Sequence, residues 1–220
     1  MNLSESSVIG LTARVLTPFY YHGLYVSDGS ATYAGVITDT ALMFALAAAF
    51  SSRYRVLRTK GDTRYRQDIA SLPWRASLLM GTHTQALAPV RHTTDITREG
   101  GYTERFRRST GSGNYKTTFL VHEIAAGSEY EGIIVGIDPF KAIPFSSAKK
   151  LVIRVGAGRL GLLELTPNPT LKQVRLNVAT ARLFGSDEKQ LSEDYRVLDT
   201  IRVSHSLSLD QAKSILLNWH

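Results

Sequence analysis

Three glycines in the second half of the chain have the spacing of a phosphate-binding loop. Gly156, Gly158 and Gly161 form G-x-G-x-x-G directly after an apolar run at 151–155. In a dinucleotide-binding unit a helix follows these glycines and faces the pyrophosphate, and an acidic residue about 20 positions later binds the ribose. Here alternating leucines continue to Pro167, and a further apolar run occupies the ribose position. The pattern argues against a dinucleotide site and indicates a strand, a glycine loop and a second strand.

Arg154 and Arg159 flank this loop. Glycines lack a Cβ, so a phosphodiester can approach the main-chain N–H groups closely while the two guanidinium groups neutralise its charge. A hairpin turn with no ligand would have the same sequence. The loop is therefore a phosphate-binding candidate only in combination with other features of the chain.

Positive charge is concentrated in one segment. The net charge is +7, and residues 53–116 hold thirteen Arg and Lys against five Asp and Glu, which leaves −1 for the rest of the chain. Eleven of the thirteen are arginine, whose planar guanidinium binds phosphate through two hydrogen bonds and stacks on bases. A solvated basic face would more often use lysine, so nucleic acid is the first partner to expect.

Tyr20, Tyr21 and His22 form an aromatic cluster in front of Gly23. RNA cleavage needs a general base for the 2′-hydroxyl and a donor for the leaving 5′-oxygen, and this cluster could supply one of them, with Lys116 or His122 as its partner. Tyrosine and histidine at a strand end more commonly pack or stack on bases. The residues therefore favour binding over catalysis and leave cleavage as the alternative.

Other classes of site lack their residues. There are no cysteines, and the six histidines show no metal-ligand spacing. The chain has no P-loop and no G-x-S-x-G nucleophile elbow. Its longest apolar stretch, residues 41–50, is shorter than the roughly 20 residues that cross a bilayer, and no basic leader is visible. We expect a cytoplasmic protein without cofactor, metal or membrane contact.

The elements that would position these residues begin with a strand and a helix. Residues 8–16 alternate between apolar and polar as a half-buried strand does, and Pro18 follows. After a connection rich in glycine and tyrosine, Thr38 or Asp39 can cap a helix that is apolar nearly all round and therefore buried. A strand, a connection and a buried helix form the opening half of a ferredoxin-like unit.

Further short strands follow, each bounded by glycine or proline. They are expected at residues 74–80, 117–124, 131–137, 151–155, 160–166 and 171–183. Ser208 and Gln211 form a capping box for a final helix, whose apolar stripe is Leu209, Ala212, Leu216 and Trp219. Residues 89–116 are polar, arginine-rich and glycine-punctuated, so they form an insertion or a hairpin. The predicted fold is α+β, a single domain of residues 1–220 around a mostly antiparallel ferredoxin-like sheet.

This order of features resembles the RAMP superfamily of CRISPR-associated proteins. The resemblance rests on the aromatic-glycine connection at 18–23, the buried helix at 37–50, the arginine-rich insertion and the loop Val155-Gly156-Ala157-Gly158-Arg159-Leu160-Gly161. Within that superfamily the chain looks most like the small subunit that caps the 5′ handle of the guide RNA in Cascade-like effector complexes, in its type IV and type I-D versions. The resemblance covers most of residues 8–166.

The resemblance implies specific roles. The glycine loop would touch handle phosphates, residues 89–116 would be a thumb-like hairpin that inserts into the guide, and residues 167–220 would be a C-terminal strand and helix extension. The expected RNA-binding residues are Tyr20, Tyr21, His22, Arg91, Arg105, Arg107, Arg108, Lys116, Arg154, Gly156, Gly158, Arg159 and Gly161. The expected partners are the guide RNA, backbone RAMP subunits, a large subunit and target DNA.

The prediction is thus a non-catalytic RNA-binding subunit of a prokaryotic class 1 effector complex. Two alternatives stay open. One is a guide-RNA-processing endoribonuclease of the same superfamily, since some of its members cleave precursor guide RNA. The other is an adaptor whose arginine-rich insertion docks on an acidic protein partner.

Overall fold

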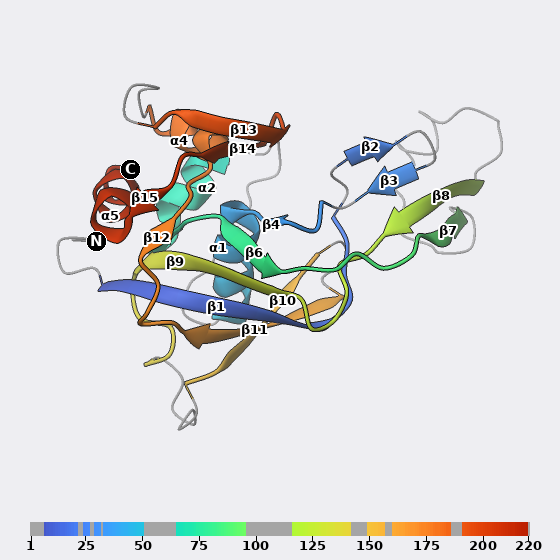
Figure 1. The fold of residues 1–220 in the computed structure, drawn as a ribbon, viewed down its shortest axis with the longest axis horizontal. Helices are drawn as coiled ribbons and strands as arrows, with labels where there is room; N and C mark the ends of the chain where they lie inside the picture. The colour runs from blue at the N-terminus through green and yellow to red at the C-terminus, as the bar shows by residue number, and fades with distance from the viewer. Residues whose placement is uncertain are drawn as a thin grey trace.

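The computed structural model describes residues 7–21, 24–26, 29–31, 33–50, 65–95, 116–141, 149–156, 160–185 and 191–219. Its centre is a curved antiparallel sheet (Figure 1). Across this main sheet the strands are β10 (Leu151–Val155), β11 (Gly161–Pro167), β1 (Ser7–Thr17), β9 (Glu129–Gly136), β6 (Leu79–His83) and β4 (Val36–Ile37), and β5 (Trp74–Ala76) also pairs with β9. β1 lies between β9 and β11, so the first strand is central, as in a ferredoxin-like unit. The predicted α+β fold is confirmed.

β1 and α1 (Asp39–Ala49) form as their sequences predict. Leu11, Ala13 and Val15 of β1 are buried, and the residues between them face outward or are half-buried. The Thr38 hydroxyl caps α1 by accepting a hydrogen bond from the Ala41 amide at 3.2 Å. The helix packs on the main sheet, and its Leu42, Met43 and Leu46 are buried in the same core cluster as β1.

The chain after β11 covers a second core. Its elements are β12 (Gln173–Val174), α4 (Val178–Leu183), β13 (Glu193–Leu198), β14 (Ile201–Ser204), β15 (Leu207–Ser208) and α5 (Leu209–Leu217). β9 links the two cores, because Tyr130 and Ile134 belong to the cluster under α1 while Ile133 and Val135 belong to the cluster under α5. The predicted capping box of Ser208 and Gln211 is present, and Trp219 is fully buried.

Two strand predictions were wrong. Residues 171–183 do not form one strand: after β12, the Asn177 side chain accepts a hydrogen bond from the Ala179 amide and starts α4. Residues 74–80 are divided between β5 and β6, because the Ser77 hydroxyl replaces a ladder partner and accepts from the Ile133 amide at 2.8 Å. α2 (Tyr65–Ser71) and the β13–β14 hairpin were not predicted.

A second, smaller sheet forms an arm that projects from the main sheet (Figure 1). Its strands run in the order β2 (Leu24–Val26), β3 (Gly29–Ala31), β8 (Lys116–His122) and β7 (Val90–Asp95). β7 and β8 pair antiparallel from Val90↔Val121 to Asp95↔Lys116, so the predicted hairpin is confirmed at its base. Residues 96–115 lie outside the described residues.

Candidate nucleic-acid interface

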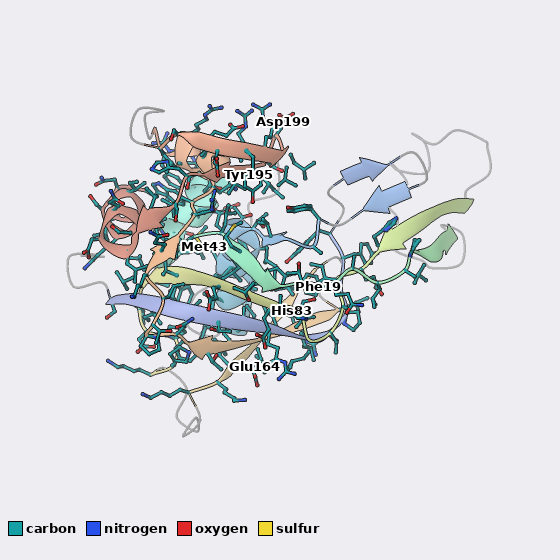
Figure 2. All side chains as sticks on the ribbon, viewed as in Figure 1. Phe19, Met43, His83, Glu164, Tyr195 and Asp199 are labelled. Atoms are coloured by element: carbon teal, nitrogen blue, oxygen red, sulfur yellow. The ribbon has the colours of Figure 1, made fainter. Side chains whose placement is uncertain are left out.

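Phe19 joins the glycine-rich hairpin to the base of the arm. It is 1% exposed and lies at the end of the main sheet from which the arm leaves (Figure 2). The Ile124 amide donates to the Phe19 carbonyl at 2.8 Å, and Ile124 lies two residues after the end of β8, in the connection from the arm to the main sheet. Phe19 therefore anchors the arm to the sheet through main-chain bonds.

The β10–β11 hairpin packs on the other side of Phe19. β10 and β11 pair antiparallel as far as Val155↔Gly161, which confirms the predicted strand, loop and strand. A Cβ on Gly161 would lie 2.5 Å from the Phe19 Cβ, and one on Gly156 would lie 2.9 Å from it. Gly156 also has φ +81°, a conformation that side chains disfavour. Both glycines are thus required by the close approach of the hairpin to Phe19.

Tyr21 extends this contact toward α1. Its ring meets the ring of Phe19 edge-on, with centroids 5.3 Å apart and planes at 80°. Tyr21 also lines a cavity of about 220 Å³ between α1 and the hairpin. The remaining lining residues are Ala41, Phe44, Ala45, Ala48, Arg154, Val155 and Gly156.

Arg154 also lines this cavity, from β10. It alternates along β10 with the buried Ile153 and Val155, so it is exposed. Tyr21, which lies far from the other two in sequence, lines one cavity together with Arg154 and Gly156, and Gly161 packs beside them on Phe19. The structure therefore brings together four of the thirteen expected residues at one end of the main sheet.

The other expected residues lie elsewhere. Tyr20, the residue between Phe19 and Tyr21 in the sequence, is half-buried and is not one of the residues that line the cavity. Arg91 and Lys116 stand on β7 and β8 in the arm, where they pair with Leu120 and Asp95. The rest lie outside the described residues: His22, Arg105, Arg107, Arg108, Gly158 and Arg159.

The environment of Tyr21 bears on the catalytic alternative. Burial raises the pKa of the Tyr21 phenol, the neighbouring Tyr130 raises it further, and a hydrogen bond from the Gly156 main chain opposes the shift. The Tyr130 hydroxyl donates to the Ala34 carbonyl at 2.6 Å. A general base must lose its proton near the working pH, so the raised pKa makes Tyr21 poorly suited to that role.

One arginine of the basic segment has a purely internal environment. Arg75 on β5 is 2% exposed, and its guanidinium donates to five main-chain carbonyls. The acceptors are the carbonyl oxygens of Ile69, Ala70, Leu72, Trp74 and Trp219. Arg75 therefore closes the C-terminal end of α2 and holds the C-terminal tail, and it does not belong to a nucleic-acid surface.

The alanines of the cavity wall were not among the predicted site residues. Ala41, Ala45 and Ala48 recur at i, i+4 and i+7 on α1 and therefore share one face. That spacing was visible in the sequence, but small apolar residues at helical intervals are also typical of close packing. Only the position of the hairpin shows that they border a cavity.

The part of the chain that the structure describes holds no group of three or more histidine, aspartate or glutamate residues arranged for a metal ion. Among the same residues, no helix is long and apolar enough to cross a membrane.

Comparison with known proteins identifies the family. A search of curated proteins finds no match. Among solved structures, the chain is similar to one from a complex described as "Cryo-EM structure of the Type III-B Cmr-beta bound to cognate target RNA and AMPPnP, state 1", with 10% identity, a TM-score of 0.40, and coverage of 94% of this chain and 88% of that one. The family model described as "Type I-D CRISPR-associated protein Cas5/Csc1" matches residues 7–200. That match spans the main sheet, the arm and most of the C-terminal extension, so the chain belongs to the type I-D CRISPR-associated Cas5/Csc1 family.

Proposed function

We propose that this Cas5-family protein is a non-catalytic RNA-binding subunit of a class 1 effector complex and that it caps the 5′ handle of the guide RNA. The observation that carries the proposal is the convergence on Phe19. The glycine-rich hairpin packs on one side of this residue and the base of the arginine-rich arm bonds to its main chain. Two features expected to bind RNA are thereby held at one end of the sheet.

The chemistry of this end suits a single-stranded RNA terminus. Single-stranded RNA is held by backbone electrostatics and by stacking of unpaired bases on aromatic and guanidinium groups. Arg154 supplies an exposed guanidinium beside the glycine-rich loop. Arg159, from the sequence, adds a second guanidinium to the same loop. The arm adds Arg91, Lys116 and the arginines at 105–108.

The partners follow from that role. The guide RNA is the primary ligand, and neighbouring RAMP subunits and a large subunit of the effector complex contact the same protein. Binding rather than cleavage is supported by Tyr21, whose raised pKa leaves the aromatic cluster without a suitable base at that position.

The test compares two arginines on opposite sides of the main sheet. Arg154→Ala removes the guanidinium at the hairpin, and Arg196→Ala removes one from β13, which lies across the sheet from β10 (Figure 1). Fluorescence anisotropy would measure binding to a guide RNA with its 5′ handle and to an RNA of equal length with a scrambled handle. We expect Arg154→Ala to weaken handle binding by about 1.5–3 kcal/mol, the range for a charge-assisted hydrogen bond, and Arg196→Ala to change it little.

A third variant tests the arm. Replacing residues 96–115 by a Gly-Ser turn preserves the β7–β8 pairing at the base and removes four arginines, and so at most four phosphate contacts. The slope of log affinity against log salt should therefore fall. A wild-type protein that binds both RNAs equally would refute handle capping. If Arg154→Ala loses the same affinity for both RNAs, Arg154 contacts phosphate without any preference for the handle.

A further inference from the structure

The elements from β12 to α5, which form the C-terminal extension, have their own strand pairing. β12 pairs with β15 and β13 pairs with β14, and among the described residues none of these strands joins the main sheet. Within the extension, the Ser204 amide donates to the Leu176 carbonyl at 3.0 Å, and the Leu176 amide donates to the Ser204 hydroxyl at 2.9 Å. The extension is therefore held together by bonds of its own.

The extension meets the rest of the chain through an apolar core and hydrogen bonds at separate points. The apolar side of β9 packs under α5 in the second core. The Leu78 amide donates to the Arg175 carbonyl at 3.0 Å, and the Arg75 side chain donates to the Trp219 carbonyl at 2.8 Å. None of these contacts is a strand pairing, so the extension can separate from the main sheet without breaking a sheet.

A third point of attachment is the side chain of Asn177, which is 1% exposed. Its Nδ2 donates to Asp39 Oδ1 at 3.1 Å and to the Thr200 carbonyl at 3.0 Å. Its Oδ1 accepts from the Ala179 and Arg202 amides. One side chain thus connects the start of α1 to both α4 and the β13–β14 hairpin.

Asp39 carries an ionisable group at this junction. It is fully buried, and its Oδ2 has no hydrogen-bond partner among the described residues. Ionising a buried carboxylate whose second oxygen lacks a donor is costly, because water is not there to solvate the charge. The docked extension therefore favours the protonated form of Asp39.

Ion pairs do not compensate a charge at Asp39 in the part of the chain that the structure describes. Ionisable side chains on the elements around α1 include Arg75 of β5, Arg154 of β10, Arg182 of α4, and Glu193, Asp199 and Arg202 of the β13–β14 hairpin. None of them pairs with Asp39, and Arg202 instead pairs with Glu193 and Asp199 at 3.5 Å each. The charged form of Asp39 thus depends on hydrogen bonds alone.

We propose that the C-terminal extension opens from the main sheet as one unit and that ionisation of Asp39 controls how often it opens. Opening removes Asn177 from Asp39 and lets water solvate the carboxylate, so the charged form favours the open state and the protonated form favours the docked state. Opening also uncovers Ile133 and Val135 of β9. Partial opening of contiguous units is a general property of folded proteins, and this one does not depend on RNA.

Hydrogen exchange of the full chain, followed by mass spectrometry from pH 4 to 7 and scaled for the intrinsic exchange rate, measures this opening. The pKa of Asp39 is raised from 3.8 to about 6 in the docked state. We expect peptides from α4, β14 and α5 to share one scaled rate, which rises about tenfold per pH unit between these values and then levels off. Peptides from β1 and β11 should exchange more slowly, because the main sheet stays closed.

Two results of this wild-type series would overturn the proposal. If the extension and the main sheet exchange at the same rate at every pH, the extension does not open by itself. If the scaled rate of the extension is independent of pH, Asp39 does not control the opening. The series needs no variant, so it decides the proposal even if a substitution at Asp39 prevents folding.

A matched pair of variants then assigns the pH dependence. Asp39→Asn removes the ionisable group from the first turn of α1, and Asp210→Asn makes the same change at an exposed aspartate in the first turn of α5. We expect the extension of Asp39→Asn to exchange about 100-fold more slowly than wild type at pH 7 and to lose its pH dependence. Asp210→Asn should keep the wild-type profile. An unchanged pH profile in Asp39→Asn would assign the effect to another group and overturn the proposal.

Discussion

The two ends of the main sheet use arginine in opposite ways. At the end where β5 pairs with β9, Arg75 is buried and its guanidinium donates to five carbonyls. At the other end, Arg154 is exposed beside a cavity of about 220 Å³. The first end is closed by its own main chain, whereas the second has an exposed guanidinium near a cavity.

This difference shows that arginine content does not identify a binding surface. A buried guanidinium is tolerated only when hydrogen bonds replace its hydration. Arg75 meets that condition with carbonyls from α2, β5 and the C-terminal tail. Arg154 has a strand position between two buried residues, so its side chain faces outward whatever the rest of the sheet does. The same residue type therefore stabilises one end and is available for binding at the other.

The largest expected effect on the free energy of unfolding comes from replacing Arg75. Arg75→Met should lower the free energy of unfolding by about 3–5 kcal/mol, because several buried carbonyls lose their donor at about 1–3 kcal/mol for each group left unpaired. Arg154→Met should change it by less than about 0.5 kcal/mol, as for other surface positions. Urea unfolding of both variants measures the contrast. Equal stability of the two variants would show that the ends do not differ in this way.

A buried carboxylate offers a second contrast with Arg75. Asp39 is fully buried at the start of α1, and its Oδ1 accepts from the Asn177 amide at 3.1 Å. Burial raises the pKa of Asp39 from 3.8 to about 6, although hydrogen bonds from Asn177 and Thr180 oppose the shift. Burial acts on both charges in the same sense, because it also lowers the pKa of Arg75.

The raised pKa of Asp39 predicts the sign of a pH effect. The folded state binds this proton more tightly than the unfolded state, so the stabilisation is present below about pH 4 and is lost as the pH rises through about 6. Asp39→Asn should match wild type near pH 4 and be more stable by about 3 kcal/mol at pH 7, at 1.36 kcal/mol for each pKa unit. Unfolding of both proteins across this range measures the difference. A difference independent of pH would contradict the assignment to Asp39.

The smallest expected effect concerns the packing of the open end. Gly161→Ala places a methyl group 2.5 Å from the Phe19 Cβ, so Phe19 must move, at about 1–3 kcal/mol for an overpacked site. Gly127→Ala has open space but φ +86°, so it should lose about 1 kcal/mol through backbone strain alone. We expect Gly161→Ala also to weaken handle binding, measured by anisotropy, and Gly127→Ala to leave it unchanged. If Gly161→Ala binds the handle as wild type does, the packing of Phe19 against the hairpin does not contribute to RNA binding.

The elements that the sequence predicts well are those whose signals are local. Thr38 caps α1 and Ser208 caps α5 through hydrogen bonds that span three residues. β10 and β11 are adjacent in the chain and are separated by a loop of glycines, so their pairing needs no distant residue. The thumb-like role of residues 89–116 stays a prediction, because only the base of that hairpin is described.

The elements that the sequence predicts poorly depend on distant partners. Val174, Leu176 and Val178 alternate as in a strand because all three enter the second core, yet Asn177 turns the chain into α4 between them. Asn177 does so while bonded to Asp39, 138 residues away, and to the Thr200 carbonyl. A local pattern cannot report such contacts.

For the candidate site, the sequence by itself determined the composition: the glycine spacing at 156–161, the arginines beside it and the aromatic residues at 19–21. Only the tertiary structure decided which of these meet. Pairing of β1 with β11 brings residue 17 beside residue 162, and this pairing sets Phe19 against Gly161 and Tyr21 against Gly156. The same packing buries Arg75 and exposes Arg154. The physical reason is that a side chain's charge is a property of the residue, whereas its hydration and its neighbours are properties of the fold.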